Sequence, residues 1–155
     1  MKRLRDIIAG QSVFCLPRGT SCLEAARYMA ERHLGAVPVL EGDLVVGIFS
    51  ERDLMSRVVA RGLDPKITPI GQAMTKEIVV GEANEAVETA LAKMKQMNVR
   101  HLPVIDGNQL IGMASLPDLL LLEVTLKDEE IRLLHDYIHY IPPGATRRAG
   151  AGGGG

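Results

Sequence analysis

HLGAVPVLEGDLVVGIFSERDL, from His33 to Leu54, occurs a second time in this chain as NVRHLPVIDGNQLIGMASLPDL, from Asn98 to Leu119. The two stretches align without a gap at a spacing of 65 residues. Because an internal repeat decides the architecture, we expect two similar units around a pseudo-two-fold axis, with a ligand cleft between them. The identical residues are Pro38, Val39, Gly42, Gly47, Ser50, Asp53 and Leu54, which match Pro103, Val104, Gly107, Gly112, Ser115, Asp118 and Leu119.

Hydrophobic periodicity gives both copies the same order of elements. In the first copy, apolar runs predict strands at 13–15, 36–40 and 44–49. A turn at 17–21 leads into a helix, and a second helix begins at Ser50 and runs towards residue 61. The first copy therefore predicts a β-α-β-β-α unit.

The second copy repeats this order. It predicts strands at 78–80, 102–105 and 110–114 and a helix over 85–97. Two β-α-β-β-α units in one chain place the protein in the α/β (α+β) class, with the units packed around a pseudo-two-fold axis.

These patterns divide the chain into five segments. We expect repeat 1 at 6–61, a linker at 62–70, repeat 2 at 71–126, a C-terminal helical extension at 127–141 and a disordered tail at 142–155. The extension keeps apolar residues at helical spacing, which favours packing against a partner subunit and hence a homodimer.

Composition excludes several classes of protein. The net charge of −1 and the few aromatic residues (three Tyr, two Phe, no Trp) argue against a nucleic-acid partner. No apolar run approaches the roughly 20 residues that span a bilayer, so no membrane partner is expected. Cys15 and Cys22 form neither a CxxC pair nor a disulfide framework. A reducing, cytoplasmic setting is the simplest interpretation.

The motif Gly-x-x-Ser-x-x-Asp stands where a strand meets a helix in each copy, as GIFSERD (47–53) and GMASLPD (112–118). Serine followed by aspartate three residues later caps a helix by itself. A helix N-terminus also attracts phosphate, and a carboxylate one turn later can accept hydrogen bonds from both ribose hydroxyls. Glycine in the preceding strand lets a base or a sugar approach the backbone. Together these features indicate an adenosine nucleotide.

The chain resembles the tandem CBS-domain proteins (Bateman modules) of the small stand-alone type. The resemblance rests on AVPVL (36–40) and RHLPVID (100–106) in the central strands and on the two Gly-x-x-Ser-x-x-Asp motifs. It extends over nearly the whole chain, from about Asp6 to Ile141. The resemblance implies a non-catalytic regulatory module that senses energy or redox state by binding AMP, ADP, ATP or NAD(H) between its repeats.

The resemblance also implies two binding sites, each shared between the repeats. In these sites Asp118 and Asp53 would bind ribose, and Ser115 and Ser50 would face ribose or phosphate. The first site would comprise Thr20, Gly35, Ala36, Val37, Arg100, His101, Gly112, Ser115 and Asp118. The second would comprise Ser50, Arg52, Asp53, Gly81, Val99 and Leu102.

The two sites are expected to be unequal. The first copy has Gly35-Ala36 where the second has Arg100-His101, so the positive charge differs. Glu82 would lie near one phosphate region and repel it. Pro117 removes a backbone donor from its helix start.

Two other classes of function remain open. A dimeric interaction module could regulate a partner protein independently of nucleotide, and the apolar C-terminal helix favours this alternative. An enzyme is not expected, because the sequence shows no activated nucleophile and no paired acid and base. No metal site is expected either, since His135 and His139 are four residues apart without accompanying ligands.

Overall fold

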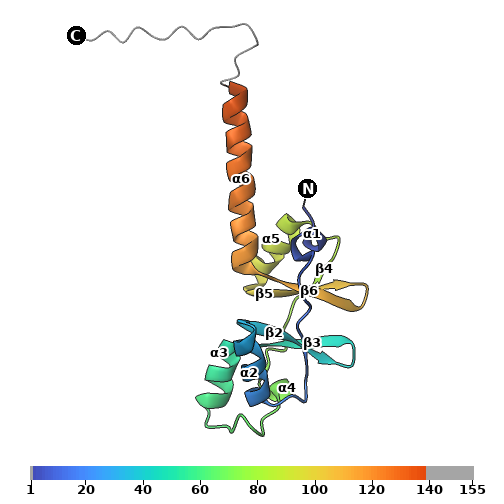
Figure 1. The fold of residues 1–155 in the computed structure, drawn as a ribbon, viewed down its shortest axis with the longest axis vertical. Coiled ribbons are helices and arrows are strands. Elements are labelled where there is room, and N and C mark those ends of the chain that lie inside the picture. The colour runs from blue at the N-terminus through green and yellow to red at the C-terminus, as the bar shows by residue number, and fades with distance from the viewer. Residues whose placement is uncertain (1, 139–155) are drawn as a thin grey trace, which may run out of the picture. The chain divides into compact units, whose positions relative to one another are not determined.

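The computed structural model describes residues 2–138. The chain divides after Leu120 into two units, and both repeats of the sheet structure lie in the first. Figure 1 shows the ribbon, with two small sheets in this first unit and helices on their outer sides.

The first sheet contains β1 (Leu16–Pro17), β2 (Ala36–Glu41) and β3 (Leu44–Ser50), in that order. β1 pairs parallel to β2, and β2 pairs antiparallel to β3. The hairpin turns at Gly42, whose φ of 60° lies in the left-handed region that glycine adopts readily. The buried β2 run of Ala-Val-Pro-Val makes this strand the centre of the unit.

The second sheet repeats the first element by element. β4 (Gly81–Glu82) pairs parallel to β5 (His101–Asp106), which pairs antiparallel to β6 (Gln109–Ser115). Both hairpins carry an irregularity at the matched place, between Val39 and Leu40 and between Val104 and Ile105. The predicted α+β class and the duplication are therefore confirmed.

Helices cover both sheets. α2 (Cys22–Glu31) and α5 (Val87–Met97) follow the first strand of each repeat. After β3 the chain forms one turn of α-helix, α3 (Glu51–Asp53), which continues as a π-helical segment, η1 (Leu54–Val59). After β6 the chain enters α6 (Leu116–Ile138).

The core of the first repeat lies between its sheet, α2, η1 and the segment 70–74. Side chains from these elements are almost fully buried, and apolar burial of this kind is the main favourable term in folding. The cluster comprises Cys22, Ala25, Met29, Val37, Val39, Phe49, Val58, Ile70, Ala73 and Met74.

Two short helices cross between the repeats: each precedes one sheet in the sequence and packs on the other sheet. α1 (Leu4–Ile8) packs on β6 of the second sheet, and α4 (Ile70–Ala73) packs on β3 of the first. The glycine of each repeated motif lies at the crossing. A Cβ on Gly47 would meet Met74 Sδ at 2.5 Å and the Thr75 carbonyl at 2.8 Å, and one on Gly112 would meet Ile8 and Gln11. The expectation that these glycines leave room for a ligand is wrong, because protein atoms fill the space.

The predicted strands at 13–15 and 78–80 are also wrong. Parallel pairing starts only where Leu16 faces Val39 and Gly81 faces Val104. Phe14 packs against the first core from an irregular segment, so its apolar character reflects burial without strand pairing.

The helix predicted after the second copy is confirmed as far as Ile138. The rest of the predicted extension, 139–141, and the predicted disordered tail, 142–155, lie outside the described residues. The division into repeats and linker stays a prediction.

Replacing Gly47 with alanine should destabilise the fold by about 1–3 kcal/mol, because the added methyl group meets a backbone carbonyl that cannot rotate away. Gly19→Ala is the matched control, since a Cβ there meets no atom within 4 Å. Urea unfolding measures both variants. Equal free energies of unfolding for Gly47→Ala and the wild type would contradict this packing.

Candidate functional site

Two adjoining clefts lie between the sheets of the first unit. One, of about 400 Å³, contains Asp53, and the other, of about 260 Å³, contains Asp118. We call them the Asp53 cleft and the Asp118 cleft. They share three wall residues, Gly35, His101 and Ser115, so that a ligand in one cleft borders the other.

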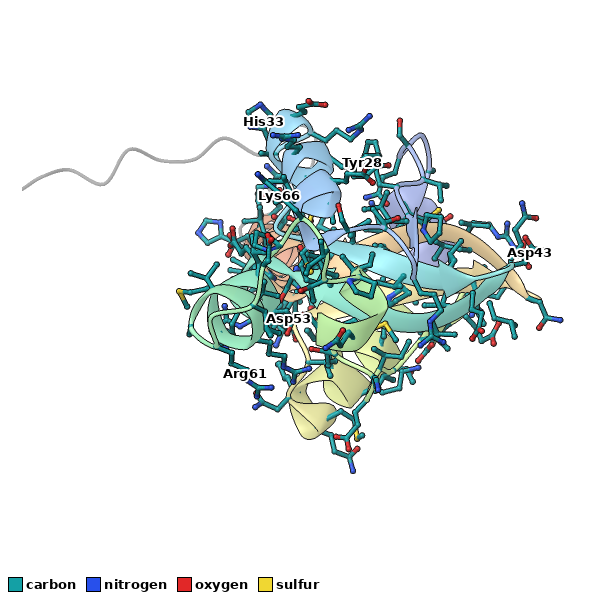
Figure 2. The ribbon with its side chains drawn as sticks, turned by 90° about the horizontal axis from the view of Figure 1, so that it is seen from below. Tyr28, His33, Asp43, Asp53, Arg61 and Lys66 are labelled. Atoms are coloured by element: carbon teal, nitrogen blue, oxygen red, sulfur yellow. The ribbon has the colours of Figure 1, made fainter. Side chains whose placement is uncertain are left out.

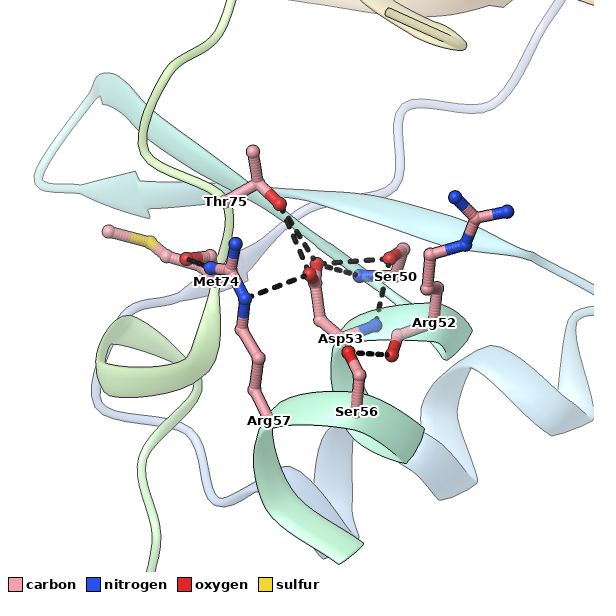
Figure 3. A network of polar contacts seen from close by, with 7 residues as sticks. All are labelled: Ser50, Arg52, Asp53, Ser56, Arg57, Met74 and Thr75. Carbon is pink, nitrogen blue, oxygen red and sulfur yellow. Dashed lines mark hydrogen bonds and ion pairs between the residues drawn. The ribbon is translucent and has the colours of Figure 1, made fainter. Parts of the chain in front are cut away.

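The carboxylate of Asp53 is buried and fully engaged within the protein. Its Oδ2 accepts hydrogen bonds from the Ser50 backbone N–H and hydroxyl, both at 3.0 Å. Thr75 Oγ1 donates to its Oδ1 at 3.1 Å, and Arg57 Nε lies 3.8 Å from the same oxygen. Figure 3 shows these groups gathered around the carboxylate. Asp53 is 5% exposed, so this network leaves it little contact with the cleft.

Asp118 occupies the equivalent position in the second repeat but is exposed. Its backbone N–H donates to Ser115 Oγ at 3.3 Å, which caps α6. Within residues 2–138 its carboxylate oxygens accept no hydrogen bond and form no ion pair. Both oxygens are therefore available to hydroxyl donors from a ligand.

The start of α6 offers few donors to a phosphate. The Leu116 N–H donates to the Arg100 carbonyl at 2.8 Å, Pro117 has no N–H, and the Asp118 N–H is used in the cap. The N–H groups of Leu116 and Asp118 are therefore not available to a phosphate at this helix N-terminus.

The guanidinium groups lie in the Asp53 cleft. Arg52 and Arg100 line it together with two carboxylates, Glu51 and Glu77. Among residues 2–138, no arginine or lysine lines the Asp118 cleft. Arg100 was expected beside Asp118, and the structure corrects this: residue 100 precedes β5 and lines the other cleft. Glu82 was expected to place a carboxylate near a phosphate region, but the carboxylates that line the Asp53 cleft are those of Glu51 and Glu77.

His101 lies in the wall between the clefts. Burial lowers the pKa of its imidazole below the ordinary value of 6.5, and the neighbouring Arg100 lowers this pKa further. Glu51 opposes both effects. The imidazole is therefore neutral at pH 7 and can offer both a donor and an acceptor.

Most of the expected site residues come together in the clefts. The Asp118 cleft contains Gly35, Ala36, His101, Ser115 and Asp118. The Asp53 cleft contains Ser50, Arg52, Asp53, Val99 and Arg100. Their roles in binding stay predictions.

Five expected residues line neither cleft. Val37 and Leu102 are fully buried in the sheets. Thr20 is tied through its carbonyl to the Ile70 N–H at 2.8 Å, beside α4. Gly112 lies beneath Ile8 and Gln11, and Gly81 lies beneath Leu4 and Leu102. Sheet pairing and the crossing helices direct all of these except Thr20 into the core, and Thr20 is half-buried.

Sequence reasoning missed the residues that precede each repeated segment. Gln11, Ser12 and Phe14 line the Asp118 cleft, and Thr75, Glu77 and Ile78 line the Asp53 cleft. Ser12 and Glu77 are 65 residues apart, and the other members of the two groups lie within one residue of matched positions, so extending the repeat towards the N-terminus would have indicated both segments. His33 and Asn98, both with φ near 55°, also enter the clefts at matched positions.

Comparison with known proteins gives a consistent result. The family model described as "CBS domain" matches residues 4–60 and 70–124. The CBS domain-containing protein YhcV of Bacillus subtilis is 35% identical over 119 residues, which cover 77% of this chain and 84% of that protein.

Solved structures agree. A CBS-domain containing protein of Agrobacterium tumefaciens has a TM-score of 0.70 at 29% identity, covering 79% of this chain and 99% of that one. Hypoxic Response Protein I, solved with two coordinated zinc ions, has a TM-score of 0.68 at 30% identity, covering 77% and 98%. The names of these relatives describe CBS-domain and response proteins, not enzymes.

Two further observations concern only the described part of the chain. It contains no group of three or more His, Cys, Asp or Glu side chains placed to hold a metal ion. His139 of the His135/His139 pair lies outside it. No helix within residues 2–138 has both the length and the apolar character required to cross a membrane.

The lowered pKa of His101 makes a prediction about stability. Between this pKa and 6.5 the unfolded chain binds more protons at His101 than the folded chain, so the free energy of unfolding falls as pH drops through this window. His101→Asn should reduce that slope, measured by urea unfolding from pH 7.5 to 5, whereas His33→Asn, at an exposed histidine, should retain it. Identical slopes in the wild type and His101→Asn would contradict the burial effect.

Proposed function

The chain belongs to the CBS-domain family, and on that premise we propose that it is a non-catalytic regulatory module that binds one adenosine nucleotide in the Asp118 cleft. The observation that supports this most directly is the exposed carboxylate of Asp118, whose two oxygens are free to accept the ribose 2′- and 3′-hydroxyls. Candidate ligands are AMP, ADP, ATP and NAD(H). A 2′-phosphate would meet this carboxylate with like charge.

The other walls of the Asp118 cleft suit a base. Phe14, Leu34 and Met113 supply apolar surface, and Phe14 is held in place by an edge-to-face contact with Tyr28 at 6.3 Å between ring centroids. The adjoining backbone of Gly35 and Ala36 offers hydrogen-bonding groups to a base edge.

The phosphates would extend across the shared wall. Since His101 and Ser115 border both clefts, a nucleotide with its ribose on Asp118 can reach towards Arg52 and Arg100 in the neighbouring cleft. Guanidinium groups bind phosphate through charge-assisted hydrogen bonds. Glu51 and Glu77 nearby would limit the number of phosphates that the site favours.

Replacement of Asp118 by asparagine should weaken binding of AMP about 10-fold or more, because hydrogen bonds to a charged acceptor contribute about 1.5–3 kcal/mol. Isothermal titration calorimetry with AMP measures this. Asp43→Asn is the matched control, since Asp43 lies at a hairpin tip, well apart from Asp53 and outside the Asp118 cleft (Figure 2). Equal affinities of wild type and Asp118→Asn would remove the basis of the proposal.

Regulation would act through a second copy and a partner enzyme or protein. α6 supports the expected homodimer, because Val124, Ile131 and Ile138 are spaced seven residues apart and are 56%, 63% and 73% exposed. Apolar residues at this period favour helix pairing between copies. The free thiols of Cys15 and Cys22 fit the expected cytoplasmic setting.

Ile131→Glu should convert the dimer to monomer by placing a charge in the paired stripe. Leu133→Glu is the control, because Leu133 is equally exposed, at 68%, but lies on another face of α6. Light scattering coupled to size-exclusion chromatography gives the mass of each variant. Retention of the dimer by Ile131→Glu would place the interface elsewhere.

A further inference from the structure

We propose that Thr75 is a specificity-determining residue, whose hydroxyl occupies the carboxylate of Asp53 and thereby excludes ribose from the Asp53 cleft. This inference rests on the proposed function, because it assumes that a free motif aspartate binds ribose. It goes further by assigning the inequality of the clefts to one side chain.

The contacts around Asp53 engage both of its carboxylate oxygens. Oδ2 already accepts two hydrogen bonds from Ser50, and Oδ1 accepts from Thr75 Oγ1 at 3.1 Å, with a longer contact from the same hydroxyl to Oδ2 at 3.4 Å. Thr75 thus supplies to Asp53 the same kind of donor, an alcohol O–H, that a ribose hydroxyl would supply.

The position of Thr75 is fixed by the backbone. Its N–H donates to the Ile48 carbonyl at 2.8 Å, and its own carbonyl accepts from the Ile48 N–H at 3.0 Å. Arg57 braces the same segment, donating from Nη1 to the Met74 carbonyl at 2.8 Å. Figure 3 shows Thr75 above the Asp53 carboxylate and Arg57 below and to its left, with Ser50 on the right. A ribose would therefore have to displace the Thr75 hydroxyl from Asp53. The two backbone hydrogen bonds with Ile48 and the contacts of Arg57 with Met74 and Asp53 stabilise the segment that carries this hydroxyl.

The second repeat lacks this hydroxyl. At the spacing of 65 residues, Thr75 corresponds to Gly10, which has no side chain. The backbone bridge is also replaced there: the Met113 N–H donates to the Gln11 side-chain Oε1 at 3.0 Å, where the matched Ile48 N–H donates to the Thr75 carbonyl. The carboxylate of Asp118 is exposed.

A titration in the Asp118→Asn background isolates the Asp53 cleft. AMP is titrated calorimetrically into Asp118→Asn, into Asp118→Asn/Thr75→Val and into Asp118→Asn/Thr75→Ser. Valine keeps the shape of threonine without its hydroxyl, and serine keeps the hydroxyl. We expect the valine double variant to bind one AMP per chain at least 10-fold more tightly than the other two, and Asp53→Asn in that variant to abolish the gain.

Thermal unfolding verifies that each variant folds, and Thr75→Ala replaces Thr75→Val if the latter does not. A valine double variant that binds no better than Asp118→Asn overturns the inference, while AMP binding by the wild type would leave the proposed function standing. Binding by Asp118→Asn alone that depends on Asp53 also overturns it, since Thr75 would then not exclude ribose. Binding of AMP by Thr75→Val but not by the wild type would support the role of Thr75 and contradict the proposed function. Failure of every variant and of the wild type to bind contradicts both.

Discussion

The hydrogen bonding of two equivalent carboxylates is the feature on which this account depends. Asp53 and Asp118 follow the same glycine and serine at the same spacing, and both serines cap the helix that follows. In the first repeat the carboxylate accepts two hydrogen bonds from the capping serine, Ser50, and one from Thr75. In the second it faces solvent. Duplication therefore built two clefts of similar frame and different chemistry.

This difference depends on where short segments cross between the repeats. α4 with the residues after it packs on β3, and α1 with the residues after it packs on β6. Each segment lies over a glycine, where any side chain would push the segment away. The glycines of the motif thus serve packing, and the crossing segment decides what lies over each aspartate. A threonine in one segment and a glycine in the other are the difference to which we assign the inequality of the two carboxylates.

The sequence supports the prediction of the repeated strands and of both caps, because short runs of buried apolar residues and local Ser-x-x-Asp hydrogen bonding act over a few residues. It does not predict the contact between Thr75 and Asp53, which joins residues 22 positions apart through the packing of α4. The sequence also does not predict that Arg100 lines the Asp53 cleft, because this depends on where β5 begins. The short strands β1 and β4 were misplaced because the apolar residues that precede them, at 13–15 and 78–80, have no strand partners.

The central claim is that one cleft per chain is open to ribose. Native mass spectrometry of the protein with excess AMP measures the number of nucleotides per chain directly. The account predicts one bound AMP per chain, lost in Asp118→Asn and retained in Asp53→Asn. Two AMP molecules per chain, or one that disappears with Asp53→Asn and persists with Asp118→Asn, would contradict it.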